Sequence, residues 1–199
     1  MNKEIDYNFK INNFTIRSNR VTKTIYKNEN IPIFRVNVWY PISSENTFKN
    51  GREIFDTFFV ELSNEFIDFI ENRMANRVVK KSDLNHPYSA VMKFIPTFED
   101  DNYLSLVVDS YLYTEKGKSK IIRMAFTFNK NTGNVVILDD IYNGLNNFII
   151  KYYEILKDKE MQSKIKKAYL NSDFYFVPNG LILFYESNCE IITKFFSNE

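Results

Sequence analysis

Cysteine and histidine are nearly absent from this chain. Its 199 residues include one cysteine, Cys189, and one histidine, His86. A single cysteine cannot form an internal disulfide, so the fold does not depend on an oxidising compartment. A single histidine excludes a histidine cluster, and any metal site would have to be built almost wholly from carboxylates. The sequence therefore predicts no metal site and no cofactor.

Glycine is also scarce, and the motifs that depend on it are missing. The five glycines are scattered at expected turns, and no phosphate loop, dinucleotide-binding pattern or serine-nucleophile pattern is present. Cys189 and His86 could in principle form a nucleophile and base pair. We expect His86, between Asn85 and Pro87, to lie in a loop, and Cys189 to be a small apolar filler between two strands. The sequence therefore predicts a protein that is not an enzyme.

Neither sign of charge is in excess, and no long apolar run occurs. Lysine and arginine total 26 against 25 aspartate and glutamate residues, which leaves a net charge of +1. Such a chain has no overall field to attract nucleic acid or an anionic membrane, and we expect its lysine groups at 80–81 and 164–167 to be solvated. Acids interrupt the most apolar stretch, residues 54–70, and residues 1–10 lack a signal-peptide pattern. If Met1 is the natural start, the sequence predicts a cytoplasmic protein with no nucleic-acid partner and no membrane insertion; its oligomeric state is left open.

Large aromatic side chains are abundant. The chain has 19 phenylalanines and 13 tyrosines, and 44% of its residues are hydrophobic. Rings must therefore fill much of the interior. Because no linker of proline, glycine or serine divides the chain, we expect residues 1–199 to form a single compact unit.

The first half of the chain changes from a strand pattern to a helix pattern. Residues 9–17, 20–27 and 33–40 alternate at period two, which predicts strands, the last of them ended by Pro41. From Asn50, which we expect to cap a helix, apolar residues recur every three or four positions. This spacing predicts a long amphipathic helix with these residues on its buried face: Phe55, Phe59, Leu62, Phe66, Ile70 and Met74.

The second half returns to strands. We expect a strand that ends at Pro96, followed by two strands joined through a turn at Gly117, and these three strands form a meander. The segment "NKNTG" is then a second turn, which leads into a further strand, "NVVIL". Asp139 is expected to cap the next helix, with Asp140 in its first turn, and a shorter helix follows over residues 159–170. Three strands end the chain. The predicted fold class is α+β: antiparallel sheet meanders, with a long helix in the first half and two shorter helices in the second packed on one face.

Three segments of the second half resemble a known family in order and spacing: "YLSLVVDSYLYT", "FTFNKNTGNVVILDDIY" and "FYFVPNGLILFYE". They resemble DUF3298, the RsiV-like domain. Residues 86–199 form the DUF3298-like portion, and residues 20–85, with "TKTIYKNENIPIFRVNVWYPIS" and the long helix, resemble its usual companion, DUF4163. The resemblance implies a module of the bacterial cell envelope, or an extracellular one, that binds another protein, in some members a lysozyme, and has no chemistry of its own.

The chain departs from that family in two places. Residues 114–120 read "TEKGKSK" where members often have Gly-Gly-Ala-His, so no functional histidine is carried over, and residues 187–196 keep only Glu190 and Ile191 of the usual final strand.

The candidate partner-binding residues lie on one expected strand. Tyr103, Tyr111, Tyr113 and Asp109 share one parity, whereas Leu104, Leu106 and Leu112 take the other. If the leucines face the core, the tyrosines form an aromatic surface suited to a protein partner. The alternative is that both faces are covered and the rings belong to the core.

The acidic residues support a second class of function. "FEDDN", residues 98–102, is the densest acidic cluster, which we expect to be a solvated turn, although three carboxylates could also bind a hard cation. Through Asp100 and Asp101 the chain could be a glycan-acting enzyme or its accessory carbohydrate-binding domain. Asp139 and Asp140 could form an acid–base pair, but capping accounts for both. A third hypothesis is a cytoplasmic immunity or regulatory protein with the same fold.

Overall fold

The structure of the chain is a computed structural model, which describes residues 14–27, 30–78, 86–114, 117–152, 159–171, 173–187 and 190–197. Eight strands and several helices follow one another in a mixed order. The elements are β1 (Ile16–Tyr26), β2 (Pro32–Ser43), α1 (Arg52–Phe69), the π-helical turn η1 (Ile70–Met74), α2 (Ala75–Val78), β3 (Tyr88–Glu99), β4 (Tyr103–Thr114), β5 (Gly117–Asn129), α3 (Leu138–Tyr142), α4 (Leu145–Lys151), α5 (Lys159–Leu170), β6 (Phe174–Val177), β7 (Gly180–Ser187) and β8 (Glu190–Ser197). The predicted α+β class is confirmed.

The first five strands form one sheet in the order β1-β2-β3-β4-β5. β3, β4 and β5 are the predicted antiparallel meander. β2 and β3 instead run parallel, from Phe34 opposite Tyr88 to Val38 opposite Met92. The long helix is the cause, because it carries the chain back along the sheet before β3 begins, as a crossover between parallel strands requires.

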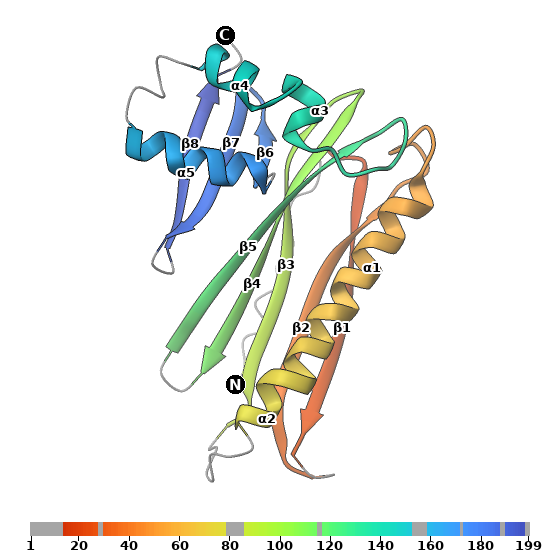
Figure 1. The fold of residues 1–199 in the computed structure, drawn as a ribbon. Coiled ribbons are helices and arrows are strands. Elements are labelled where there is room, and N and C mark those ends of the chain that lie inside the picture. The colour runs from red at the N-terminus through yellow and green to blue at the C-terminus, as the bar shows by residue number, and fades with distance from the viewer. Residues whose placement is uncertain are drawn as a thin grey trace.

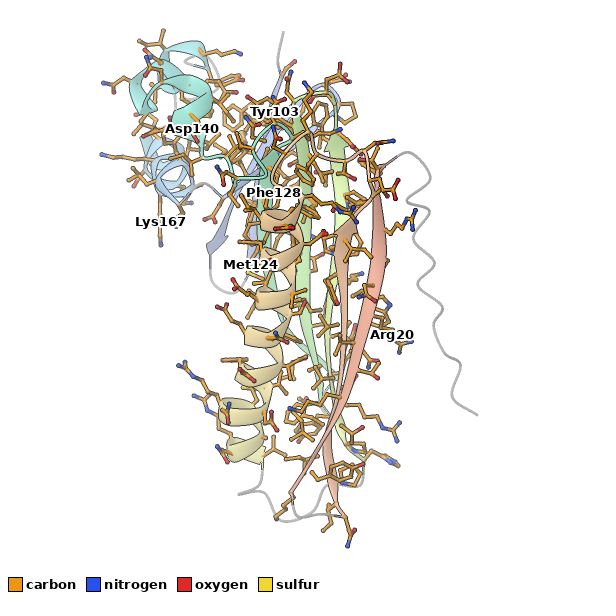
Figure 2. The ribbon with its side chains drawn as sticks, turned by 90° about the vertical axis from the view of Figure 1, so that its right-hand side faces the viewer. Arg20, Tyr103, Met124, Phe128, Asp140 and Lys167 are labelled. Carbon is orange, nitrogen blue, oxygen red and sulfur yellow. The ribbon has the colours of Figure 1, made fainter. Side chains whose placement is uncertain are left out.

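α1 covers one face of this sheet with phenylalanine rings. Phe55, Phe59 and Phe128 have no exposed surface, and the ring of Phe55 meets that of Phe128 edge to face at 4.8 Å. Figure 2 shows Phe128 between the helix and the strands. Edge-to-face pairs add about 0.5–1.5 kcal/mol beyond the burial of their area, which is how a chain with many phenylalanines builds a specific core.

The last three strands form a second, antiparallel sheet in the order β6-β7-β8. On one side of it, α4 and α5 enclose a second core that includes Phe148, Phe174 and Phe196. On the other side, Tyr175 and Phe184 pack against Val107 of β4. The shorter helices therefore cover the second sheet, and the long helix covers the first (Figure 1).

Two prolines do not end their strands as expected. β2 continues past Pro41 to Ser43, and β3 continues past Pro96 to Glu99. Pro41 lies beyond the segment of β2 that pairs with β3, so the missing N–H breaks no bond on that side. At Pro96 the register of β3 against β4 shifts, a bulge that accommodates the proline.

Other expected boundaries also differ. Residues 17–26 belong to one continuous strand rather than two, whereas residues 9–13 lie outside the described part of the chain. "NVVIL" makes only a single bridge, from Val135 to Phe128. The helix expected to follow residue 139 is divided into α3 and α4 at Asn143 and Gly144, whose φ angles of 52° and 106° are not helical.

Both expected helix caps differ in the structure. α1 begins after Gly51, at a φ of 77°, so Asn50 is not its cap. Gly51 lies against Gly133 of the "NTG" turn, and a Cβ on either would overlap the backbone of the other segment. At α3 the Ile137 N–H donates to the Asp140 carboxylate at 3.1 Å, so Asp140, and not Asp139, caps the first turn.

Candidate functional site

β4 separates its side chains between two environments, as its alternation predicts. Leu104 and Leu106 are fully buried in the core under α1, and Leu112 is partly buried against the same core. Tyr111 and Tyr113 have the opposite parity and lie on the face of the sheet turned away from α1. We call this surface the helix-free face. The predicted orientation of the leucines is confirmed, whereas partner binding by the tyrosines stays a prediction.

Asp109 is the buried centre of the helix-free face. Its side chain is 2% exposed, and Arg123 on β5 donates to it twice, from Nε at 2.8 Å and from Nη2 at 2.9 Å. The Tyr111 hydroxyl donates to the same carboxylate at 3.1 Å. The two charged residues are direct partners in the β4–β5 register, which explains the bidentate geometry.

This arrangement raises the pKa values of Tyr111 and Arg123. Burial, followed by the negative charge of Asp109, raises the pKa of Tyr111 to about 12. Hydrogen bonds to Asp109 raise the pKa of Arg123. At neutral pH the phenol is therefore a hydrogen-bond donor rather than a base, and the guanidinium keeps its charge. The hydrogen bonds of this cluster fix the directions of the Tyr111 and Arg123 side chains on the helix-free face.

Aromatic and basic side chains surround this centre. The ring of Tyr111 stacks on that of Tyr113 at 6.2 Å, and the Lys93 ammonium lies 5.0 Å from the centre of the Tyr111 ring. Tyr113 is 37% exposed. Further along the same face, the Arg20 guanidinium lies 4.7 Å from the Trp39 ring, and Figure 2 shows Arg20 on the side away from α1. Cations over rings are attracted by the ring quadrupole, so the two pairs fix long basic side chains.

Tyr103 does not belong to this group. It lies at the opposite end of β4, about 33 Å along the strand from Tyr113 at 3.3 Å per residue. Its ring is 5.7 Å from that of Phe176 on β6 and packs against the second core. Of the four candidate binding residues, the structure brings together Asp109, Tyr111 and Tyr113 and places Tyr103 elsewhere.

The acidic cluster serves the turn between β3 and β4. Asp100 accepts the amides of Asn102 and Tyr103 at 2.8 and 2.7 Å, and Asp101 is exposed. Glu99 differs from the expected solvated acid, because it forms a largely buried ion pair with Lys130 at 2.7 Å. Lys130 is remote in the sequence, so no local pattern could have revealed this pair. Within the described residues no group of three or more potential metal ligands occurs.

The remaining candidates are exposed or not described. His86 is exposed, and so are Lys166 and Lys167, whereas Lys164 is partly buried. Cys189, Lys80 and Lys81 lie outside the described residues, so the dyad of Cys189 with His86 stays untested.

A cleft that sequence reasoning missed lies at the end of β4 that carries Tyr103. Its volume is about 360 Å³, and its lining includes the rings of Phe98, Tyr103, Tyr142 and Phe176. These side chains come from β3, β4, α3 and β6. Only the tertiary fold assembles them, so no spacing in the sequence signals the cleft.

Comparison with known proteins gives a result at the level of the fold. No protein-family model matches the sequence, and no curated protein matches it. Among solved structures, a DUF3298 family protein from Pseudomonas aeruginosa PAO1 superposes with a TM-score of 0.53 at 8% identity, over 92% of this chain and 90% of that one. The chain shares the fold of a DUF3298 protein. A member of the DUF3298 family from Bacteroides fragilis NCTC 9343 has a TM-score of 0.48 at 14% identity, over 92% of this chain and 89% of its own.

These identities show the fold and transfer no residue roles. Among the described residues, none of the helices combines the length and the apolar character that crossing a bilayer requires.

Proposed function

We propose that the chain is a non-catalytic protein-binding module of the sensor or inhibitor kind, which holds its partner on the helix-free face around Tyr111 and Tyr113. The observation that carries the proposal is the stacked tyrosine pair supported by a buried, bidentate ion pair. Tyrosine and arginine are enriched among the residues that dominate binding energy, above all where neighbouring groups hold them in place.

Rigidity supports this proposal. The Tyr111 hydroxyl is bonded to Asp109, and its ring is flanked by Tyr113 and Lys93. A side chain that is already ordered loses little rotamer entropy on association, so more of its contact energy appears as affinity. The same order restricts the face to partners of matching shape.

Charge indicates which partners the face suits. Among the described residues, the charged side chains of this face are four basic ones and one acid. The acid, Asp109, is already paired with Arg123. The basic residues lie on β1, β2, β3 and β5: Arg20, Arg35, Lys93 and Arg123. A partner with an acidic or neutral patch is favoured over a basic one, because like charges across an interface are penalised. Independently of the charge argument, the resemblance to DUF3298 and to the RsiV-like and DUF4163 segments suggests an envelope enzyme such as a lysozyme as a partner to test, and a lysozyme without a strongly basic contact patch fits this face best.

The glycan-acting alternative has weaker support. Asp100 is engaged with two backbone amides of its own turn, as a structural turn residue is. We expect that Asp100→Asn, which keeps the accepting oxygen, leaves any glycan turnover by the preparation unchanged. A cytoplasmic immunity or regulatory protein would use the same face on a different partner, and the identity of the captured protein separates that case.

The experiment compares capture by the wild-type chain with capture by a Tyr111→Ala/Tyr113→Ala variant. Both are immobilised and exposed to an extract of the source cells and, separately, to purified lysozyme. We expect the variant to bind its partner at least tenfold more weakly, about 1.4 kcal/mol, with an unchanged circular dichroism spectrum.

Phe69→Ala is the control, because Phe69 is a 40% exposed aromatic residue of α1, the helix that covers the opposite face of the sheet. It should bind as the wild type does. Equal capture by the folded double variant would show that the partner, if there is one, binds elsewhere.

A further inference from the structure

The cleft beside Tyr103 lies where the two sheets meet. The β3–β4 turn, the start of β4, the end of β6 and the helices α3 and α4 come together there (Figure 1). Its volume of about 360 Å³ falls within the range of small-molecule sites, about 300–1,000 Å³. It lies at the opposite end of β4 from Tyr111 and Tyr113, so the proposed function does not use it.

Aromatic rings form the walls of the cleft. Phe176 is 9% exposed, and the rings of Phe98 and Tyr103 each lie 5.7 Å from it, tilted at 58° and 46°. Rings whose centres lie 5.7 Å apart are in direct contact, so these three rings form a continuous aromatic wall with no room for a further group between them. Because the wall is inclined rather than flat, it suits an apolar body that packs against several rings at once, and less a sugar, which stacks on a single open ring.

Lys151 provides a cation at the cleft. It is the last residue of α4, and its ammonium lies 5.5 Å from the centre of the Tyr142 ring and 5.3 Å from that of Tyr152. Among the described residues, the Lys151 ammonium contacts these two rings and forms no ion pair with a carboxylate. The two tyrosine hydroxyls are 3.0 Å apart, and burial raises the pKa of Tyr142, so the phenol stays neutral and does not cancel the charge. The ammonium can therefore attract an anionic group of a ligand.

Asp100 provides an anion at the same cleft. The amides of Asn102 and Tyr103 hold one of its oxygens, Oδ1, at 2.8 and 2.7 Å, and Lys130 donates to its backbone carbonyl at 2.9 Å. The carboxylate is thus fixed in direction. No ion pair to it occurs among the described residues, so its charge is available to a cationic group.

We propose that this cleft binds a small zwitterion with an apolar side chain: an aromatic amino acid, or a dipeptide that contains one. The apolar side chain would pack against the wall formed by Phe98, Tyr103 and Phe176, the carboxylate would face Lys151, and the ammonium would face Asp100. The apolar contact supplies most of the affinity and the two charges supply the orientation, because exposed charges such as Lys151 and Asp100 contribute little each.

The experiment is a titration of the isotope-labelled full chain, followed through its backbone amide NMR signals. The probes are L-phenylalanine and L-alanyl-L-phenylalanine, whose charged ends differ in separation. N-acetyl-L-phenylalanine amide, which has the same ring and no charge, is the matched ligand control. We expect saturable shifts around residues 98–103, 141–151 and 176–177 below about 10 mM of one zwitterion, and at least threefold weaker binding of the neutral analogue.

Two variants test the charges. Lys151→Met and Asp100→Asn should each weaken binding about threefold. The control is Lys167→Met on α5, an exposed lysine that does not line the cleft and should change nothing (Figure 2). Three results would overturn the proposal: no saturable shifts with either zwitterion, equal affinity for the neutral analogue, or saturation by N-acetylglucosamine in place of the zwitterions.

Discussion

The two ends of β4 present the same face of one strand to different neighbours. At the end that begins with Tyr103, the second sheet covers this face, and Val107 packs against Tyr175 and Phe184. At the other end, Tyr111 is partly buried and Tyr113 is exposed. The four-residue strand β6 is too short to cover a twelve-residue strand along its whole length.

The two ends therefore satisfy their polar groups differently. At the covered end, the Ser105 hydroxyl on β4 accepts a hydrogen bond from the amide N–H of Phe176 on β6 at 2.9 Å, and this bond links the two sheets. The same hydroxyl lies 2.8 Å from the Thr127 hydroxyl on β5. At the other end, Asp109 is satisfied within its own sheet by Arg123. A polar group that forms its hydrogen bonds across two layers stabilises the packing of those layers. A polar group whose hydrogen bonds lie within one sheet does not require a second layer, so the face of that sheet can bind another molecule.

Removal of Asp109 should have the largest effect on stability. Asp109→Ala leaves the buried charge of Arg123 without its ion-pair partner. We expect the free energy of unfolding to fall by about 3 kcal/mol, the lower end of the range for broken buried ion pairs, because the Arg123 side chain is 26% exposed. Urea unfolding measures the change.

The control for this prediction removes both charges. Asp109→Leu/Arg123→Met should recover most of the loss, because neither charge then stays buried alone. A double variant as unstable as the single one would show that the pair acts through something other than its charge.

Local sequence patterns predicted the helices and strands well, but they predicted less well which tertiary neighbours each side chain contacts. The alternation of β4 was enough to place Leu104 and Leu106 in the core, because parity depends only on the strand itself. The alternation could not show that the ring of Tyr103 contacts Phe176 whereas that of Tyr113 does not. That contact depends on where β6, a strand far along the chain, packs against β4. Parity therefore placed the leucines correctly, but it grouped Tyr103 with Asp109, Tyr111 and Tyr113, from which the structure separates it, and partner binding by these residues stays a prediction.

The wrong boundaries have a common cause. Pro41 and Pro96 were read as strand ends from their missing N–H, but whether that N–H has a partner depends on the neighbouring strand. Asn50 was expected to cap α1 from its side chain, whereas contact with Gly133 selects Gly51. In each case a tertiary neighbour overrides a local preference that was itself read correctly.

The junction between the sheets should give the second largest effect. Ser105→Ala removes the acceptor of the Phe176 amide, and a buried N–H left without a partner costs about 1–3 kcal/mol. Ser110→Ala is a closely matched control: the residue is buried on the same strand, but its hydroxyl has no hydrogen-bond partner among the described residues. We expect this control to be neutral or slightly stabilising in urea unfolding. If both variants lose equal stability, the hydrogen bond across the sheets does not hold them together.

Truncation of the two tyrosines compares the two ends of β4 directly. Tyr103→Ala removes a ring packed against Phe176 and the second core and should cost about 2 kcal/mol, below the range for a fully buried ring because Tyr103 is partly exposed. Tyr113→Ala, at 37% exposure, should cost about 0.5 kcal/mol. Thermal unfolding of both variants tests the ranking. A reversed order would mean that the Tyr113 end carries more of the packing than its exposure indicates.

The response of Tyr111 to alkaline pH should be a small effect as long as the pH stays near 10. Burial and the charge of Asp109 raise its pKa from 10.0 to about 12, so between these values the unfolded chain loses this proton while the folded chain keeps it. The folded state then binds more protons, and the free energy of unfolding falls as pH rises through this range, whereas below pH 10 the contribution is fully present. Tyr111→Phe has no proton to lose, so its stability should fall less steeply over the same range, although Tyr142, Tyr169 and Tyr175, whose pKa values are also raised, retain part of the slope. Urea unfolding of both proteins on either side of pH 10 measures the difference, and parallel curves would show that the Tyr111 hydroxyl is as free to ionise in the fold as in the unfolded chain.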